Sequence, residues 1–87
     1  MSSSPHVPAD ALPPLPDEPQ PGRYRHYKGM EYLVTGLARH SETLEPLVVY
    51  QALYGERGLW VRPAAMFTEL VEVAGWRGPR FTRIGDA

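Results

Sequence analysis

Apolar and polar residues alternate along much of the chain after residue 22, as expected for β-strands that bury one face. The stretches with this pattern are residues 23–27, 30–39, 47–54, 59–62 and 69–74. Lys28 and Gly29 predict a tight turn after the first stretch, and residues 55–58 predict a hairpin turn after the third. Pro63 lacks an amide donor, so it ends the fourth strand and favours a short helical turn through Phe67.

Five short strands with frequent turn residues predict an all-β fold: a small five-stranded barrel or roll of the SH3-like type, with one short helical turn before the last strand. One face of the longest strand holds Tyr32, Val34, Gly36 and Ala38. We expect Gly36 to let this strand bend around a barrel corner where a side chain would clash. Residues 76–87 are predicted to form a tail across the barrel, which Phe81 and Ile84 pin in place.

Residues 1–21 differ in composition from the remainder of the chain. They contain seven of the ten prolines and none of the aromatic residues. Because proline fixes φ and removes an amide donor, we expect a disordered or polyproline-like tail at residues 1–21 and the β-domain at residues 22–87. The tail has a formal charge of −3 and the domain +2. A solvated extension explains the tail most simply, and the sequence LPPLP at residues 12–16 leaves a docking peptide as an alternative.

The composition excludes several classes of function. A chain of 87 residues forms one small domain and leaves little room for a large active-site cleft. The net charge of −1 argues against a surface that is basic throughout, while a local basic patch stays open. Cysteine is absent, which excludes disulfides and thiolate zinc sites, and we expect no metal and no cofactor. Neither a signal peptide nor an apolar membrane span is found, so we expect a cytoplasmic protein with no membrane partner.

Several separate motifs resemble a known bacterial family. They are residues 22–29 (GRYRHYKG), 40–43 (HSET), 48–55 (VVYQALYG), 60–63 (WVRP) and 66–67 (MF), in matching order and spacing. In these motifs the chain is similar to the family called domain of unknown function 1653, over about residues 22–81. The resemblance implies an SH3-like barrel in a bacterial protein. It implies no activity and no site residues, because the family is named for lacking an established function.

The strongest candidate for a binding surface is the first strand and the turn after it, with the residues Arg23, Tyr24, Arg25, His26, Tyr27 and Lys28. Interleaved basic and aromatic side chains occur where proteins neutralise phosphates and stack bases. Alternation places Arg23, Arg25 and Tyr27 on one face of a strand, so one face should be packed and the other exposed to solvent. The alternative is structural: the tyrosines pack, and the arginines are solvated or pair with Glu31 and Glu45.

A polar segment contains the residue types of a nucleophilic relay, in the order His40, Ser41, Glu42 and Thr43. Their adjacency opposes that function, because neighbouring side chains of an extended chain point apart while a relay must gather around the imidazole. A turn in which a hydroxyl bonds backbone amides is the structural interpretation, and a binding rim is another. A metal site at His26 and His40 would need a further ligand such as Glu31 or Glu42.

The fourth strand has two alternating faces, one with Trp60 and Arg62 and the other with Leu59 and Val61. If Trp60 faces solvent, it can line an aromatic groove with Tyr50 and Tyr54 for a peptide or a cation. We favour the arrangement in which Trp60 is packed inside, because a small domain needs its large side chains in the core.

These observations favour a non-enzymatic binding or accessory module that contacts a protein or a nucleic acid through an aromatic and basic face. The candidate ligand-binding residues are Arg23, Tyr24, Arg25, His26, Lys28, His40, Ser41, Glu42, Thr43, Tyr50, Trp60 and Arg62. No catalytic residue is assigned. The alternative is a small hydrolase-like enzyme that uses His40, Ser41 and Glu42.

Overall fold

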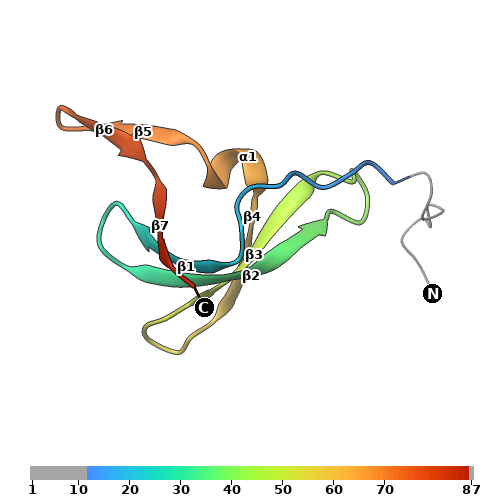
Figure 1. The fold of residues 1–87 in the computed structure, drawn as a ribbon, viewed down its shortest axis with the longest axis horizontal. Helices are drawn as coiled ribbons and strands as arrows, with labels where there is room; N and C mark the ends of the chain where they lie inside the picture. The colour runs from blue at the N-terminus through green and yellow to red at the C-terminus, as the bar shows by residue number, and fades with distance from the viewer. Residues whose placement is uncertain (1–11, 87) are drawn as a thin grey trace.

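The computed structural model describes residues 12–86 of the protein (Figure 1). In chain order the elements are β1 (Gly22–His26), β2 (Glu31–Arg39), β3 (Pro46–Ala52), β4 (Leu59–Pro63), α1 (Ala64–Phe67), β5 (Leu70–Val73), β6 (Trp76–Pro79) and β7 (Phe81–Gly85). Strands therefore dominate the described chain, as predicted. The short helical turn expected after Pro63 is confirmed as α1.

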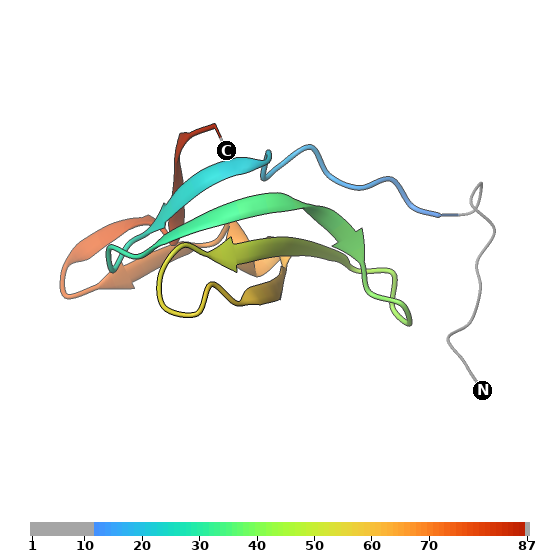
Figure 2. The same ribbon diagram turned by 90° about the horizontal axis from the view of Figure 1, so that it is seen from below.

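The strands form two antiparallel sheets. The larger has the order β4-β3-β2-β1-β7, and β5 pairs only with β6 in a hairpin that extends away from it in Figure 1. β4 and β7 are the two edges of the larger sheet, so this sheet curves without closing into a barrel (Figure 2). Over residues 12–86, seven strands in two sheets replace the predicted five, and the five-stranded SH3-like barrel is not confirmed.

The prediction of a tail at residues 76–87 is wrong, because most of this segment is β6 and β7. Ala74 and Gly75 both have positive φ values, 50° and 84°, which is the conformation of the two-residue turns that join strands in tight hairpins. This turn reverses the chain after β5 and starts β6. β7 then pairs with β1, with Arg25 opposite Thr82 and His26 opposite Phe81.

Aromatic rings fill the core on one face of the larger sheet. The buried apolar residues are Tyr24, Tyr32, Val34, Val48, Tyr50, Ala52, Ala64, Phe67 and Phe81. The rings of Phe67 and Phe81 stack with centroids 4.0 Å apart and planes 1° from parallel. Phe81 therefore anchors the C-terminal segment as predicted, whereas Ile84 is only half-buried.

β2 contains an irregularity that changes which residues face the core. Its register against β3 shifts between Val34 and Gly36, which leaves Thr35 as an extra residue. Beyond the shift Leu37 packs against the core, so the predicted alternation through Gly36 and Ala38 is wrong. The clash expected at Gly36 is also wrong, because a Cβ atom built there meets no atom within 4 Å.

The described part of the proline-rich segment contacts the domain through its backbone carbonyls. Arg39 donates to the carbonyl oxygen of Pro13 at 2.7 and 3.1 Å. The Tyr24 hydroxyl donates to Gln20 O at 2.7 Å, and Arg83 donates to Pro21 O at 2.9 Å. Within residues 12–86, the ion pairs do not include the acidic residues of this segment.

Gly22 and Gly36 form a matched pair for testing the backbone geometry. Gly22 has a φ of 145°, and a Cβ atom there would lie 2.6 Å from the backbone oxygen of Gly85 in β7. We expect Gly22→Ala to lower the free energy of unfolding by about 1–3 kcal/mol through strain and displacement of β7. Gly36→Ala should leave the free energy of unfolding unchanged or raise it by about 0.5–1 kcal/mol, because alanine loses less backbone entropy than glycine when the strand forms. Urea unfolding followed by tryptophan fluorescence measures both, and equal effects would contradict this account.

Candidate functional site

The two faces of β1 differ as the alternation predicted. Tyr24 is buried and only 5% exposed, while Arg23 and Arg25 are exposed on the opposite face. This opposite face continues onto β7, since Thr82 lies directly across from Arg25. Here it is called the β1–β7 face. It brings one part of the predicted basic and aromatic stretch beside the C-terminal strands.

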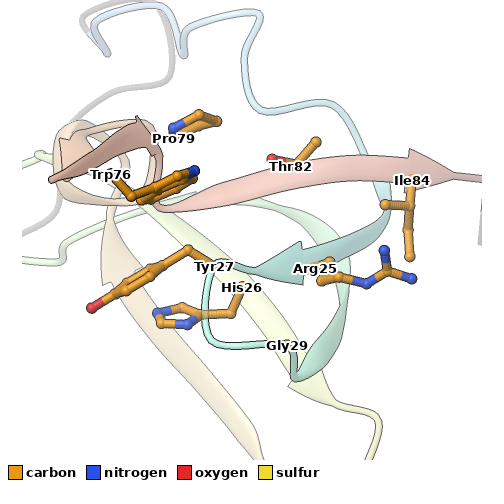
Figure 3. A pocket seen from close by; sticks show the side chains of 8 residues that line it. All are labelled: Arg25, His26, Tyr27, Gly29, Trp76, Pro79, Thr82 and Ile84. Carbon is orange, nitrogen blue, oxygen red and sulfur yellow. The ribbon is translucent and has the colours of Figure 1, made fainter. Parts of the chain in front are cut away.

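The β1–β7 face holds an open pocket of about 250 Å³ (Figure 3). Its lining residues come from β1, from the turn after it and from the last two strands: Arg25, His26, Tyr27, Gly29, Trp76, Pro79, Thr82 and Ile84. In Figure 3 the rings of Tyr27 and Trp76 lie on one side of this region, and Arg25 and Ile84 on the other. The pocket is therefore aromatic at one end and cationic at the other.

The aromatic wall of the pocket consists of Tyr27 and Trp76. Their rings are stacked, with centroids 5.8 Å apart and planes 16° from parallel. His26 lies against Tyr27 with a centroid distance of 4.5 Å, and the Lys28 ammonium is 5.9 Å from the Tyr27 centroid. Tyr27 is half-buried and Trp76 is 46% exposed, so part of the wall is open to a ligand. A flat ring can stack on such a surface.

The cations of this face are available to a negatively charged ligand. Arg25 donates to the Glu31 carboxylate at 3.1 Å, and both side chains are well exposed to solvent. An ion pair of this kind contributes at most about 1 kcal/mol, so the guanidinium can leave it at little cost. Lys28 is exposed in the turn after β1, on the edge of the aromatic wall.

His26 is the titratable group in the pocket with a shifted pKa. Burial lowers its pKa below the ordinary 6.5, and the positive charges of Arg80, Arg62 and Lys28 lower it further. Its Nδ1 atom accepts a hydrogen bond from the Lys28 backbone amide at 3.1 Å. A neutral imidazole with an unprotonated Nδ1 therefore shapes the turn that presents Lys28.

Three other predicted site residues lie on the core side of the sheet. Tyr24 is buried, with its hydroxyl donating to Gln20 O, and Tyr50 is 6% exposed. Arg62 donates from Nε to the Tyr50 hydroxyl at 3.4 Å, and its guanidinium is 5.9 Å from the Phe81 centroid. Their contacts are structural, and they do not line the pocket.

A hydroxyl pair joins buried Tyr32 to Tyr54, which is exposed at the edge of the core. The hydroxyls of Tyr32 and Tyr54 are 2.7 Å apart. Burial is the largest cause of a raised Tyr32 pKa, about 12, and the hydrogen bond to Tyr54 adds to it. Tyr32 therefore belongs to the core, at 8% exposure, and its contacts are structural.

The prediction that Trp60 is packed in the core is wrong, because it is 58% exposed. Leu59 and Val61 are exposed as well, at 68% and 60%. The physical reason is position: β4 is an edge strand with β3 on one side only. The alternative groove of Trp60 with Tyr50 and Tyr54 is not formed either, since Tyr50 is buried and the hollow beside Trp60 is lined by Val49, Leu59 and Val61.

The segment from His40 to Thr43 is a turn held by the histidine. Nδ1 of His40 accepts hydrogen bonds from the backbone amides of Glu42 at 3.1 Å and Thr43 at 3.3 Å. Thr43 Oγ1 accepts from the Glu45 amide at 3.2 Å. Among the contacts of residues 12–86, no hydrogen bond joins Ser41 to His40 or Glu42. These contacts support the structural interpretation of this segment.

Neither a metal cluster nor a membrane-spanning helix occurs in the described part of the chain. Over residues 12–86, no three His, Asp or Glu side chains gather as metal ligands would. The helix found there, α1, has four residues and is far too short to cross a bilayer.

Sequence reasoning missed half of the pocket. The sequence pattern predicts a tail over residues 76–87, so it does not place the side chains of Trp76, Pro79, Thr82 and Ile84 beside β1. Tyr27 belongs to the predicted basic and aromatic stretch and lies on the predicted face, although the candidate ligand-binding residues do not include it. A usable signal was the Ala74-Gly75 pair directly after an alternating stretch, which favours a hairpin and so predicts a strand at Trp76.

Comparisons with known proteins agree with the sequence motifs. Residues 22–83 match the family described as protein of unknown function, DUF1653. A crystal structure of a DUF1653 protein from Bordetella bronchiseptica is similar to this chain, with 41% sequence identity and a TM-score of 0.75. That similarity covers 82% of this chain and 94% of the Bordetella chain. A search among curated proteins found no significant match.

The lowered pKa of His26 gives a pH dependence of known sign. Because its pKa is lowered on folding, its contribution to stability is complete above pH 6.5 and is lost as the pH falls below that value. An NMR titration of the imidazole resonances should give a pKa below 6.5 for His26, and the Lys28 amide should exchange faster once the ring is protonated. A pKa at or above 6.5 would contradict the burial and charge environment described here.

Proposed function

The chain belongs to the DUF1653 family of proteins of unknown function, and we propose that it is a non-enzymatic module that binds single-stranded nucleic acid on its β1–β7 face. The family supplies no activity, so the proposal depends on the site itself. The observation that supports it best is the stacked pair of Tyr27 and Trp76 beside the exposed cations Arg25 and Lys28.

Single strands offer two kinds of group to a protein: flat bases and charged phosphates. A base stacks on an aromatic side chain with a contribution of about 1–3 kcal/mol, and a cation neutralises the neighbouring phosphate. In this proposal a base stacks on the exposed part of Trp76. The Arg25 guanidinium leaves the Glu31 carboxylate and donates to a phosphate oxygen instead. Thr82, across from Arg25, adds a hydroxyl that can donate to the same phosphate.

The charge distribution supports an anionic ligand for the domain. Residues 22–87 have a net charge of +2, although the whole chain has −1. Three basic residues, Arg23, Arg25 and Lys28, follow one another at short intervals along β1 and its turn. An association driven partly by phosphate contacts weakens as salt rises.

The hydrolase alternative has less support. A relay needs an imidazole nitrogen free to accept the proton of the nucleophile. Nδ1 of His40 accepts hydrogen bonds from two backbone amides, so the proton of the neutral ring is on Nε2 and neither nitrogen is free to accept another. The pocket is also lined by other residues.

The two tryptophans provide a matched test of the site. Trp76 lines the pocket, whereas Trp60 has similar exposure on the edge strand at the other side of the sheet. We expect Trp76→Ala to weaken binding of a mixed-sequence single-stranded oligonucleotide by about 5–150-fold, the loss of one stacked base. Trp60→Ala should change the affinity less than about twofold. Fluorescence anisotropy with a labelled oligonucleotide at low salt measures all three proteins.

A second prediction concerns salt. Arg25→Ala should weaken binding and reduce the slope of log affinity against log salt by about 0.7, the value for one phosphate contact on a single strand. Arg77→Ala is the control, since Arg77 is exposed on β6 but does not line the pocket. No binding by the unmodified protein at low salt, or equal losses in the two tryptophan variants, would contradict the proposed function and direct attention to a protein ligand.

A further inference from the structure

The second notable surface is the free edge of the larger sheet at β4. This strand is hydrogen-bonded to β3 on one side, and no strand of residues 12–86 is hydrogen-bonded to its other side. Leu59, Trp60 and Val61 are consecutive and all more than half exposed. Val49 of β3 joins them in lining an open hollow on the sheet. A continuous exposed apolar edge of this kind attracts another strand.

The backbone of β4 offers hydrogen bonds in a defined order. The Ala52 amide donates to Gly58 O at 3.0 Å, so the opposed pair Ala52 and Gly58 is hydrogen-bonded. Hydrogen-bonded pairs alternate along an antiparallel ladder, which makes Trp60 and Arg62 the β4 residues bonded to β3. The amides and carbonyls of Leu59 and Val61, and the carbonyl of Pro63, therefore point away from the sheet.

The opposite edge of the sheet is protected, in contrast to β4. β7 has polar Thr82 and Arg83 among its exposed residues, and its register against β1 is irregular between Arg23 and Tyr24. Arg83 also ties the edge to Pro21 and to Asp86, each at 2.9 Å. Charges, irregular register and covering segments are the features that prevent edge pairing. β4 lacks them over Leu59 to Val61.

We propose that β4 pairs antiparallel with β4 of a second copy of this chain, about a twofold axis at Val61. Val61 is the middle residue of β4, so this register is the one that pairs the whole strand. The two Val61 residues exchange two hydrogen bonds. Each Leu59 amide donates to the Pro63 carbonyl of the second copy, and the missing amide of Pro63 ends the ladder there.

In this register the β4 side chains of one copy are complementary to those of the second copy. Leu59 lies opposite Pro63, which places apolar groups together. Trp60 lies opposite Arg62 of the second copy on the same face, where Arg62 already contacts the Tyr50 hydroxyl and the Phe81 ring and the exposed Trp60 ring can cover the half-buried guanidinium. This charge and ring complementarity favours a second copy over an unrelated apolar strand. The pairing leaves the β1–β7 face free at the other side of each sheet.

Disulfide trapping tests this register directly, because the chain has no cysteine of its own. Hydrogen-bonded residues opposed across an antiparallel pair have Cα atoms about 5.5 Å apart, within the range that a disulfide spans. We expect full-length Val61→Cys to form a covalent dimer under mild oxidation at least about tenfold faster than Val73→Cys. Val73 is the matched control, since it is also an exposed strand valine but lies on β5.

A second variant measures the association without a crosslink. Val61→Lys places a charge at the centre of the pairing, and sedimentation at increasing concentration should show a reversible dimer for the unmodified protein and only monomer for this variant. Val73→Lys should dimerise like the unmodified protein. Circular dichroism checks that all variants are folded. Equal crosslinking of the two cysteine variants, or a monomer at all concentrations of the unmodified protein, would overturn the proposal.

Discussion

The stacking of Phe67 on Phe81 is the contact on which the remaining structure depends. The two rings are parallel and 4.0 Å apart, and they join the helical turn α1 to the last strand β7. Tyr24, Tyr32 and Tyr50 surround this pair with edge-on contacts, at centroid distances between 5.5 and 6.0 Å. Rings bury a large apolar area each, which suits a domain with few core positions.

This core also positions the candidate site. The Phe81 side chain packs in the core on one face of the larger sheet. Because successive side chains alternate, Thr82 must lie on the opposite face, beside Arg25. The Tyr27 amide donates to Arg80 O at 2.9 Å, and the Arg80 amide donates to Glu69 O at 3.0 Å. These bonds place the start of β7 between the turn after β1 and the residues that lead into β5. Trp76 is thereby brought over Tyr27.

The positions of the first five strands can be predicted from sequence, because alternation and turn residues are local signals. The strands at β1 to β5, the turn at Lys28 and Gly29, and the helical turn after Pro63 are all found. The inward side of β2 beyond Val34 is not predictable from alternation, since the extra residue Thr35 reverses it. The exposure of Trp60 depends on sheet order, which alternation does not reveal. Alternation likewise does not reveal that β7 is the neighbour of β1. The sequence therefore indicates the basic half of the site but not the half that β6 and β7 supply.

The central claim is that ligands bind on the β1–β7 face, and an amide NMR titration of the full chain with a mixed-sequence single-stranded oligonucleotide tests it most directly. The account predicts shifts gathered at Arg25, Tyr27, Trp76 and Thr82, with the His40 to Thr43 turn and β4 unaffected. Shifts centred on that turn or on β4 would contradict it. So would a spectrum that does not change at low salt.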